Sequence, residues 1–141
     1  MSMRRNSIWL VVLLALVGCQ NPVQQIAGTY AYKISGQYTV DDTEYVLSDE
    51  MGAMDIICQT DSTVLLTFNA LRGPAYSTFA TIRSKQLTLQ PYERDVNEAG
   101  TNYHVTASGQ GTIYDGTILI TLSYQSTSLT ADSLIVLCKK N

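Results

Sequence analysis

The segment YHVTASGQGTIYDGTILITLSYQ, residues 103–125, consists of two β-patterned runs on either side of Asp115-Gly116. An Asp-Gly pair in this position is a strong signal for a two-residue hairpin of type I′, in which both turn residues have positive φ. Such a turn sets the register by counting outward. It pairs Ala107 with Tyr124, Gly109 with Leu122 and Gly111 with Ile120 on one face. Small residues therefore lie opposite large ones, and the glycines allow the bending that a closing barrel requires.

From residue 27 onward the chain repeats a two-residue alternation and shows no helical period over ten or more residues. Turn residues separate the runs, and the polar segment 93–100 is predicted to be a loop. The expected strands are residues 29–34, 43–48, 53–60, 63–70, 75–82, 85–91, 102–114, 117–126 and 132–139. The predicted fold class is all-β, an antiparallel up-and-down β-barrel of about eight or nine strands, because closure removes exposed strand edges.

A second hairpin is predicted between residues 53–60 and 63–70. We expect a three-residue turn at residues 61–63, because an odd loop keeps the apolar side chains of both strands on one face. That register puts Ile56 opposite Phe68.

The N-terminus carries Arg4 and Arg5 ahead of an uncharged apolar run, residues 8–17. Ten residues are too few for a membrane-spanning helix, which needs about 20, and are typical of a secretory signal peptide. The next residues, Leu16-Val17-Gly18-Cys19, resemble the lipobox of bacterial lipoproteins, in which the cysteine is acylated and the chain is cut before it. The resemblance implies that Cys19 is lipidated and anchors the protein in a membrane.

This resemblance divides the chain into three parts: a signal peptide at 1–18, a lipidated tether at 19–26 and a single β-barrel domain at 27–141. Cleavage removes two of the nine basic side chains, so seven remain against twelve acidic ones and the formal charge is −5. An acidic domain without a basic cluster argues against nucleic acid as a partner. Gln20 after the cysteine resembles the sorting pattern of outer-membrane lipoproteins, so we expect the cell envelope, at the outer membrane facing the periplasm.

Gly28-Thr29-Tyr30 at the first strand and the late hairpin GQGTIYDGTILIT resemble the calycin or lipocalin-like lipoproteins of Gram-negative envelopes. Tyr30 stands where the lipocalin G-x-W motif has tryptophan, and the usual C-terminal helix is replaced by a strand. The resemblance implies a barrel that binds a small apolar or amphipathic molecule. The inner-face candidates for that site are Tyr30, Tyr32, Leu66, Phe68, Leu122 and Tyr124.

These positions carry no charge, so a neutral or amphipathic guest is expected rather than a metal or phosphate. The alternative is that the same rings fill the core. In that case the closed barrel acts through its outside, as an accessory subunit or inhibitor that docks another envelope protein.

Residue types suited to catalysis are sparse. We therefore expect that the protein is not an enzyme and that it holds no cofactor and no metal ion. His104 is the sole histidine and is predicted to be a solvated strand residue, and no serine lies in a G-x-S-x-G motif. The carboxylates at residues 41–44, 49–50 and 93–98 lack the spacing of a calcium loop and are predicted to be solvated loop charges.

Cys58 and Cys138 remain after Cys19. In an oxidising envelope compartment they either form a disulfide or stay as two separate buried thiols. Both lie in apolar strands, where a thiol is chemically inert.

Overall fold

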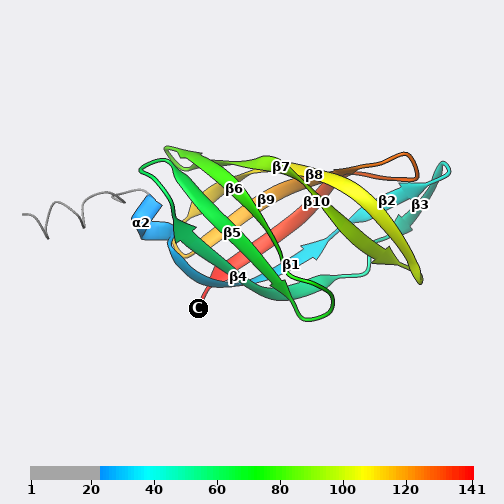
Figure 1. Ribbon diagram of the computed structural model, residues 1–141, viewed down its shortest axis with the longest axis horizontal. Helices are drawn as coiled ribbons and strands as arrows, with labels where there is room; N and C mark the ends of the chain where they lie inside the picture. The colour runs from blue at the N-terminus through cyan, green and yellow to red at the C-terminus, as the bar shows by residue number, and fades with distance from the viewer. Residues whose placement is uncertain (1–22) are drawn as a thin grey trace, which may run out of the picture.

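The computed structural model describes residues 23–141 (Figure 1). Cys19 and the predicted signal peptide lie outside the described residues, so both stay predictions. Within this range the chain forms one short helix and ten strands. They are α2 Val23–Ile26, β1 Gly28–Ser35, β2 Gln37–Val40, β3 Thr43–Val46, β4 Glu50–Cys58, β5 Thr63–Ala70, β6 Tyr76–Arg83, β7 Gln86–Glu98, β8 Thr101–Tyr114, β9 Thr117–Gln125 and β10 Leu129–Lys140.

Eight of the strands found in residues 23–141 form a closed antiparallel barrel, in the order β1-β4-β5-β6-β7-β8-β9-β10. β10 pairs back with β1, from Tyr30 opposite Lys140 to Ser35 opposite Ile135. β2 and β3 form a hairpin that pairs with the start of β10 and extends beyond the barrel (Figure 1). The predicted all-β antiparallel barrel is therefore confirmed.

The helix α2 covers one end of the barrel (Figure 1). Val23 and Ile26 are buried, and the Tyr30 hydroxyl donates a 2.8 Å hydrogen bond to the Ile26 carbonyl. Residues 23–26 were predicted to be tether, which is wrong because two apolar side chains three apart share a face of one helical turn and join the core. Across residues 23–141 the structure holds no helix with the length and apolar character needed to cross a membrane.

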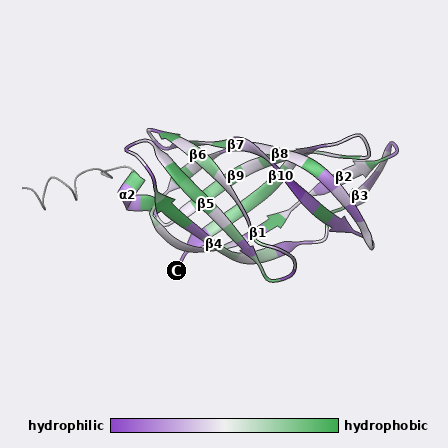
Figure 2. Cartoon of the chain, in the orientation of Figure 1, coloured by the Kyte–Doolittle hydropathy of each residue, from purple (hydrophilic) through white to green (hydrophobic). Residues whose placement is uncertain are grey.

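We call this end the α2 end; it comprises α2, the turns at 59–62, 84–85 and 115–116, and the C-terminus. The opposite end, the mouth, is surrounded by the β2–β3 hairpin and by the loops at 47–49, 71–75 and 99–100. Figure 2 shows hydrophilic residues gathered on β3 and on the part of β7 near the mouth.

The β8–β9 hairpin has the predicted register, from Ala107 opposite Tyr124 to Tyr114 opposite Thr117. A side chain is not tolerated at Gly109 of β8, because a Cβ there would lie 2.5 Å from a carbonyl oxygen of β9. The small-to-large pairing predicted from the sequence is confirmed.

The turn type of this hairpin was predicted wrongly. Gly116 has a φ of 72°, but Asp115 is not among the residues with positive φ, so the turn is not type I′. Successive positive φ values occur instead at Asp41-Asp42, 51° and 64°, and at Ala99-Gly100, 51° and 82°. These two turns join β2 to β3 and β7 to β8.

The β4–β5 hairpin has the predicted faces but a shifted register. Ile56 lies opposite Leu66 instead of Phe68. The loop starts one residue earlier than expected, since the amides of Gln59 and Thr60 both donate to the Thr63 carbonyl, at 3.0 and 3.1 Å. A shift by two residues preserves the side-chain faces, because the period of a strand is two.

Candidate functional site

A β-bulge in β7 determines which of its side chains enter the barrel. Pairing with β8 is interrupted between Leu89 and Tyr92, and the two residues between them, Gln90 and Pro91, are both exposed. One extra residue exchanges the two faces of the strand beyond it. Proline suits this position because it has no N–H to donate to the ladder. Beyond the bulge the inner face continues with Tyr92, Arg94, Val96 and Glu98.

Residues 93–98 are therefore strand, and the predicted loop over 93–100 is wrong. Two carboxylates expected to be solvated, Glu50 and Glu98, instead face the barrel interior. Glu98 is 4% exposed, and each of its carboxylate oxygens accepts a 3.2 Å hydrogen bond from the Ser48 amide. Glu50 opens β4 on the same face as buried Met54.

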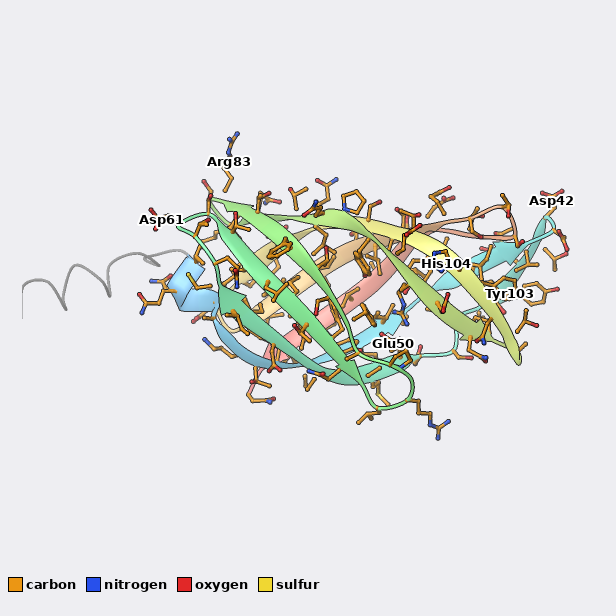
Figure 3. The ribbon with its side chains drawn as sticks, viewed as in Figure 1. Asp42, Glu50, Asp61, Arg83, Tyr103 and His104 are labelled. Atoms are coloured by element: carbon orange, nitrogen blue, oxygen red, sulfur yellow. The ribbon has the colours of Figure 1, made fainter. Side chains whose placement is uncertain are left out.

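Arg94 and Glu50 form a bidentate ion pair inside the mouth. Arg94 Nη2 lies 2.7 Å from Glu50 Oε1, and Nη1 lies 3.2 Å from Oε2. Their side chains are 10% and 18% exposed, and Figure 3 marks Glu50 at the start of β4. The pair joins β7 to β4, which are not neighbours in the barrel. Two parallel charge-assisted hydrogen bonds fix the geometry of this cross-barrel link.

Three tyrosine hydroxyls complete the arrangement. Tyr32, at 3.0 Å, and Tyr76 both donate to Glu50 Oε2, and Arg94 Nη1 donates to the Tyr124 hydroxyl at 3.4 Å. The Arg94 guanidinium also lies 4.0 Å from the centroid of the Tyr76 ring, within the range of a cation–π contact. We call these five side chains, which come from five different strands, the Arg94–Glu50 cluster: Tyr32, Glu50, Tyr76, Arg94 and Tyr124.

The cluster keeps its charges at neutral pH. Burial favours a higher pKa for Glu50, but the hydrogen bonds and charge of Arg94, with the two tyrosine hydroxyls, hold the pKa of Glu50 below its ordinary value. Burial disfavours the charged form of Arg94, yet its hydrogen bonds to Glu50 raise its pKa. Burial raises the pKa of Tyr124 to about 12. The cluster thus presents fixed donors and acceptors, and none of these groups exchanges a proton near neutral pH.

Aromatic rings continue from the cluster across the interior. Tyr32 meets Phe68 edge-on, with centroids 5.1 Å apart, and Phe68 stacks on Tyr76 at 4.9 Å. Tyr76 stacks on Tyr92 at 5.7 Å. The Tyr92 hydroxyl is buried and has no hydrogen-bond partner among residues 23–141. An unpaired buried hydroxyl costs about 1–3 kcal/mol, so Tyr92 offers an unused donor next to the cluster.

A cavity of about 910 Å³ opens at the mouth. Its inner wall includes Glu50, Arg94 and Tyr124, and apolar side chains line it beside them, including Ile34 and Val96. The loop at residues 71–74, the last residues of β7 and Ala99 form its rim. Its volume lies within the range of small-molecule sites, and its lining combines apolar walls with a few convergent polar groups.

The six residues predicted to line a ligand site are all buried on the inner face: Tyr30, Tyr32, Leu66, Phe68, Leu122 and Tyr124. Of the six, Tyr124 lines the mouth cavity, and Tyr32 reaches it through Glu50. Leu66, Phe68 and Leu122 pack in the filled middle of the barrel. Tyr30 borders a smaller cavity at the α2 end. The prediction that these six residues face inward was correct. The mouth cavity, however, lies nearer the rim of the barrel than most of them, and charged side chains line it.

His104 lies on the outer face, as predicted, and its side chain is 62% exposed. Its Nδ1 lies 2.8 Å from Asp95 Oδ1 and its Nε2 3.5 Å from Glu93 Oε1. The hydrogen bond with Asp95, the larger effect, and that with Glu93 raise the pKa of His104. Over residues 23–141, no group of three or more His, Cys, Asp or Glu side chains is arranged to hold a metal ion.

Of the two alternatives left open for Cys58 and Cys138, the disulfide between them is excluded, because Cys138 is a free, buried thiol. Its Sγ lies 3.9 Å from Met54 Sδ on β4. Cys58 lies four residues further along β4, about 13 Å away at roughly 3.3 Å per residue. That separation is far beyond the reach of a disulfide bond.

Comparison with known proteins gives no match to any family model and none to any curated protein. Among solved structures, the chain is similar to that of a redesigned β-barrel. The two are 13% identical, the match covers 87% of this chain and 96% of that chain, and the TM-score is 0.48. The description of this protein as a closed eight-stranded barrel therefore stands on its own strand pairing.

Proposed function

We propose that this protein is a membrane-anchored lipoprotein of the cell envelope, without catalytic activity, that binds a small apolar or amphipathic molecule in a lipocalin-like barrel. The mouth cavity of about 910 Å³ is the observation that supports this proposal. Its apolar wall, with Ile34, Leu47 and Val96, suits a hydrocarbon portion of a guest. The Arg94–Glu50 cluster suits a polar head.

The cluster also bears on the chemistry of that head. Arg94 and Glu50 neutralise each other, so together they present both a donor and an acceptor without net charge. A neutral or zwitterionic head that both donates and accepts hydrogen bonds can contact both residues. An anionic head would have to compete with Glu50 for Arg94. The sequence favoured a neutral or amphipathic guest because no inner charge was expected, and the paired charges favour the same class for a different reason.

The ligand proposal is tested by native mass spectrometry of the protein purified from its own envelope. Val96→Trp fills the cavity, and Val46→Trp makes the same change on β3 at a side chain that is 75% exposed. We expect a co-purifying small molecule in wild type and Val46→Trp and its loss in Val96→Trp, with circular dichroism confirming that both variants fold. A wild-type protein without a guest, or a guest retained by Val96→Trp, contradicts binding at the mouth.

The proposed anchor is Cys19, and the proposed location is the outer membrane facing the periplasm. Cys19→Ala is expected to abolish labelling by a radioactive fatty acid and to leave an unprocessed precursor. Cys138→Ala is the matched control and should be labelled like wild type, because its thiol is buried in the barrel. Equal labelling of Cys19→Ala and wild type would refute the anchor.

A second candidate function is that of an accessory subunit or inhibitor that docks another envelope protein. A row of exposed apolar side chains on the outer face favours it: Met51, Leu137 and Leu119 are 50%, 38% and 37% exposed. Leu137 lies opposite Leu119, and Lys33 lies between Leu137 and Met51. Apolar rows of this kind are found at protein interfaces.

The docking candidate is tested by a photo-crosslinking residue at Leu137 in intact envelopes. The control is the same residue at Thr81, an exposed position on β6, four strands away around the barrel. One defined crosslinked product from position 137 and none from position 81 would support docking. Equal, diffuse products from both positions would count against it.

A further inference from the structure

Charge is distributed unevenly along the barrel axis. Four of the seven basic side chains in residues 23–141 lie at the α2 end, and all four are exposed: Arg83, Lys85, Lys139 and Lys140. This end also carries two acidic side chains, Asp61 and Asp115, so the formal charge of its side chains is +2. Figure 3 shows Arg83 and Asp61 at this end and Asp42 at the opposite end.

The mouth is strongly acidic by comparison. It carries the other three basic side chains and nine acidic ones, a formal charge of −6. The acidic residues lie in the β2–β3 hairpin, the loop before β4, the first residue of β4, the mouth half of β7 and the start of β10. The remaining carboxylate, Asp55, is held on the barrel wall by Thr29 and Asn69. The domain is acidic overall, yet the side chains of its two ends differ by eight formal charges.

The length of the tether determines which end lies near a membrane. Val23 is the fourth residue after Cys19, and four fully extended residues span at most about 14 Å. With Cys19 at the bilayer surface, the α2 end lies within one or two Debye lengths of it, each about 8 Å at physiological ionic strength. The mouth is roughly 20 Å further away, since β1 has eight residues and barrel strands are tilted. Lipid charge therefore acts mainly on the α2 end.

A smaller cavity of about 410 Å³ lies at this end. Lys85 and Lys140 line it, together with Tyr30, Tyr114 and Asp115. Lys140 Nζ donates a 3.1 Å hydrogen bond to the Gln25 carbonyl and lies 5.9 Å from the centroid of the Tyr30 ring. An ammonium group has three donors, so both lysines can still donate to a phosphate oxygen.

We propose that the α2 end is a docking surface for anionic phospholipid headgroups, with the cavity between Lys85 and Lys140 receiving a headgroup phosphate. The proposal rests on the proposed anchor at Cys19. The same headgroups repel the acidic mouth. The barrel consequently stands with its mouth directed away from the bilayer, and a ligand enters from the aqueous side.

Two tryptophan reporters test this orientation. The sole tryptophan of the chain, Trp9, precedes Cys19, so cleavage before Cys19 leaves a mature protein without tryptophan fluorescence of its own. Tyr114→Trp reports on the α2 end and Tyr45→Trp on the mouth end; the replaced side chains are 55% and 47% exposed. The lipidated proteins are reconstituted into phosphatidylcholine vesicles with or without phosphatidylglycerol. Both vesicle types contain a lipid with a spin-labelled headgroup, which quenches nearby tryptophan fluorescence. The fluorescence is measured on the protein that floats with the vesicles.

We expect the Tyr114→Trp protein to be quenched more strongly when phosphatidylglycerol is present, and this increase to disappear at high salt. The Tyr45→Trp protein should show little quenching in either vesicle. Adding Lys85→Gln and Lys140→Gln to the Tyr114→Trp protein should abolish the phosphatidylglycerol-dependent increase. The matched pair Lys33→Gln and Arg72→Gln, at the mouth end, should leave the increase intact.

Equal quenching of the two reporters, or quenching of the Tyr114→Trp protein that does not respond to phosphatidylglycerol, would overturn the docking surface while leaving the anchor in place. A protein that fails to float with either vesicle would overturn the anchor at Cys19 and the docking surface with it. The two failures are therefore distinguishable.

Discussion

Arg94→Met removes the cation of the Arg94–Glu50 cluster and leaves the Glu50 carboxylate, 18% exposed, with the hydroxyls of Tyr32 and Tyr76. Removing one partner of a buried ion pair costs about 3–5 kcal/mol. Because Glu50 retains some solvent contact and two hydrogen-bond donors, we expect the lower end, a loss of about 3 kcal/mol in the free energy of unfolding at neutral pH. With a urea m-value of about 2 kcal/mol per M, the unfolding midpoint falls by about 1.5 M.

The loss should depend on pH. In wild type the pKa of Glu50 is held below its ordinary value of 4.5. Glu50 therefore contributes stability above its unfolded pKa, and this contribution is lost as the pH falls through the lower folded pKa. In Arg94→Met, burial is expected to raise the folded pKa above the unfolded value, so acidification relieves the unfavourable buried charge. The difference between the two proteins is largest near neutral pH and shrinks below the ordinary pKa of glutamate.

Urea unfolding followed by circular dichroism, at neutral pH and in a buffer below the ordinary pKa of glutamate, measures both effects. Arg72→Met is the matched control, because Arg72 is an exposed arginine on the rim of the same cavity; it should change stability by less than about 0.5 kcal/mol. Adding Glu50→Gln to Arg94→Met should recover part of the loss. The reasoning is refuted if Arg94→Met is as stable as Arg72→Met, or if its loss is the same at both pH values.

Three further predictions concern the barrel itself. Gly109→Ala should cost about 1–3 kcal/mol in a thermal or urea melt, because the new Cβ would lie 2.5 Å from a carbonyl oxygen of β9; Gln110→Ala, on the outer face, should be neutral. Deleting Pro91 should remove the bulge and turn Arg94 outward, giving at least the loss seen for Arg94→Met, whereas deleting Thr127 in the β9–β10 loop should be tolerated. Burial raises the pKa of Cys138 to about 12, so a maleimide should modify this thiol in urea but not in the native protein, as followed by peptide mapping; rapid native labelling would contradict its burial.

The part of the fold that the sequence predicted best is the β8–β9 hairpin. Two long alternating runs separated by two turn residues allow a single register, which is obtained by counting outward from the turn. The structure has that register throughout the hairpin. The β4–β5 hairpin was less accessible, since a loop shifted by one residue moves the register by two while leaving the faces unchanged. The inward direction of Ile56 and Phe68 was therefore predicted correctly even though their pairing was not.

The candidate site was largely hidden from the sequence. Tyr32 and Tyr124 were correctly assigned to the interior, but Glu50 and the segment containing Arg94 were predicted to be solvated. Pro91 after Gln90, at the end of a regular alternation, was the available signal for the bulge. Without knowing that β7 continues beyond it, the same residues are equally consistent with the start of a polar loop.

The sequence by itself determined that the chain forms short strands with one apolar face and that small residues of one strand oppose large ones of the next, because both properties depend on neighbours a few residues apart. The tertiary structure alone decided that Glu50 and Arg94, 44 residues apart, meet inside the mouth. Alternation specifies a period of two, but one extra residue at the bulge reverses its phase, and the sequence pattern does not state which side of the bulge faces inward. β4 and β7 face each other across the interior only when all eight strands have closed into a barrel, so no local sequence pattern encodes their contact.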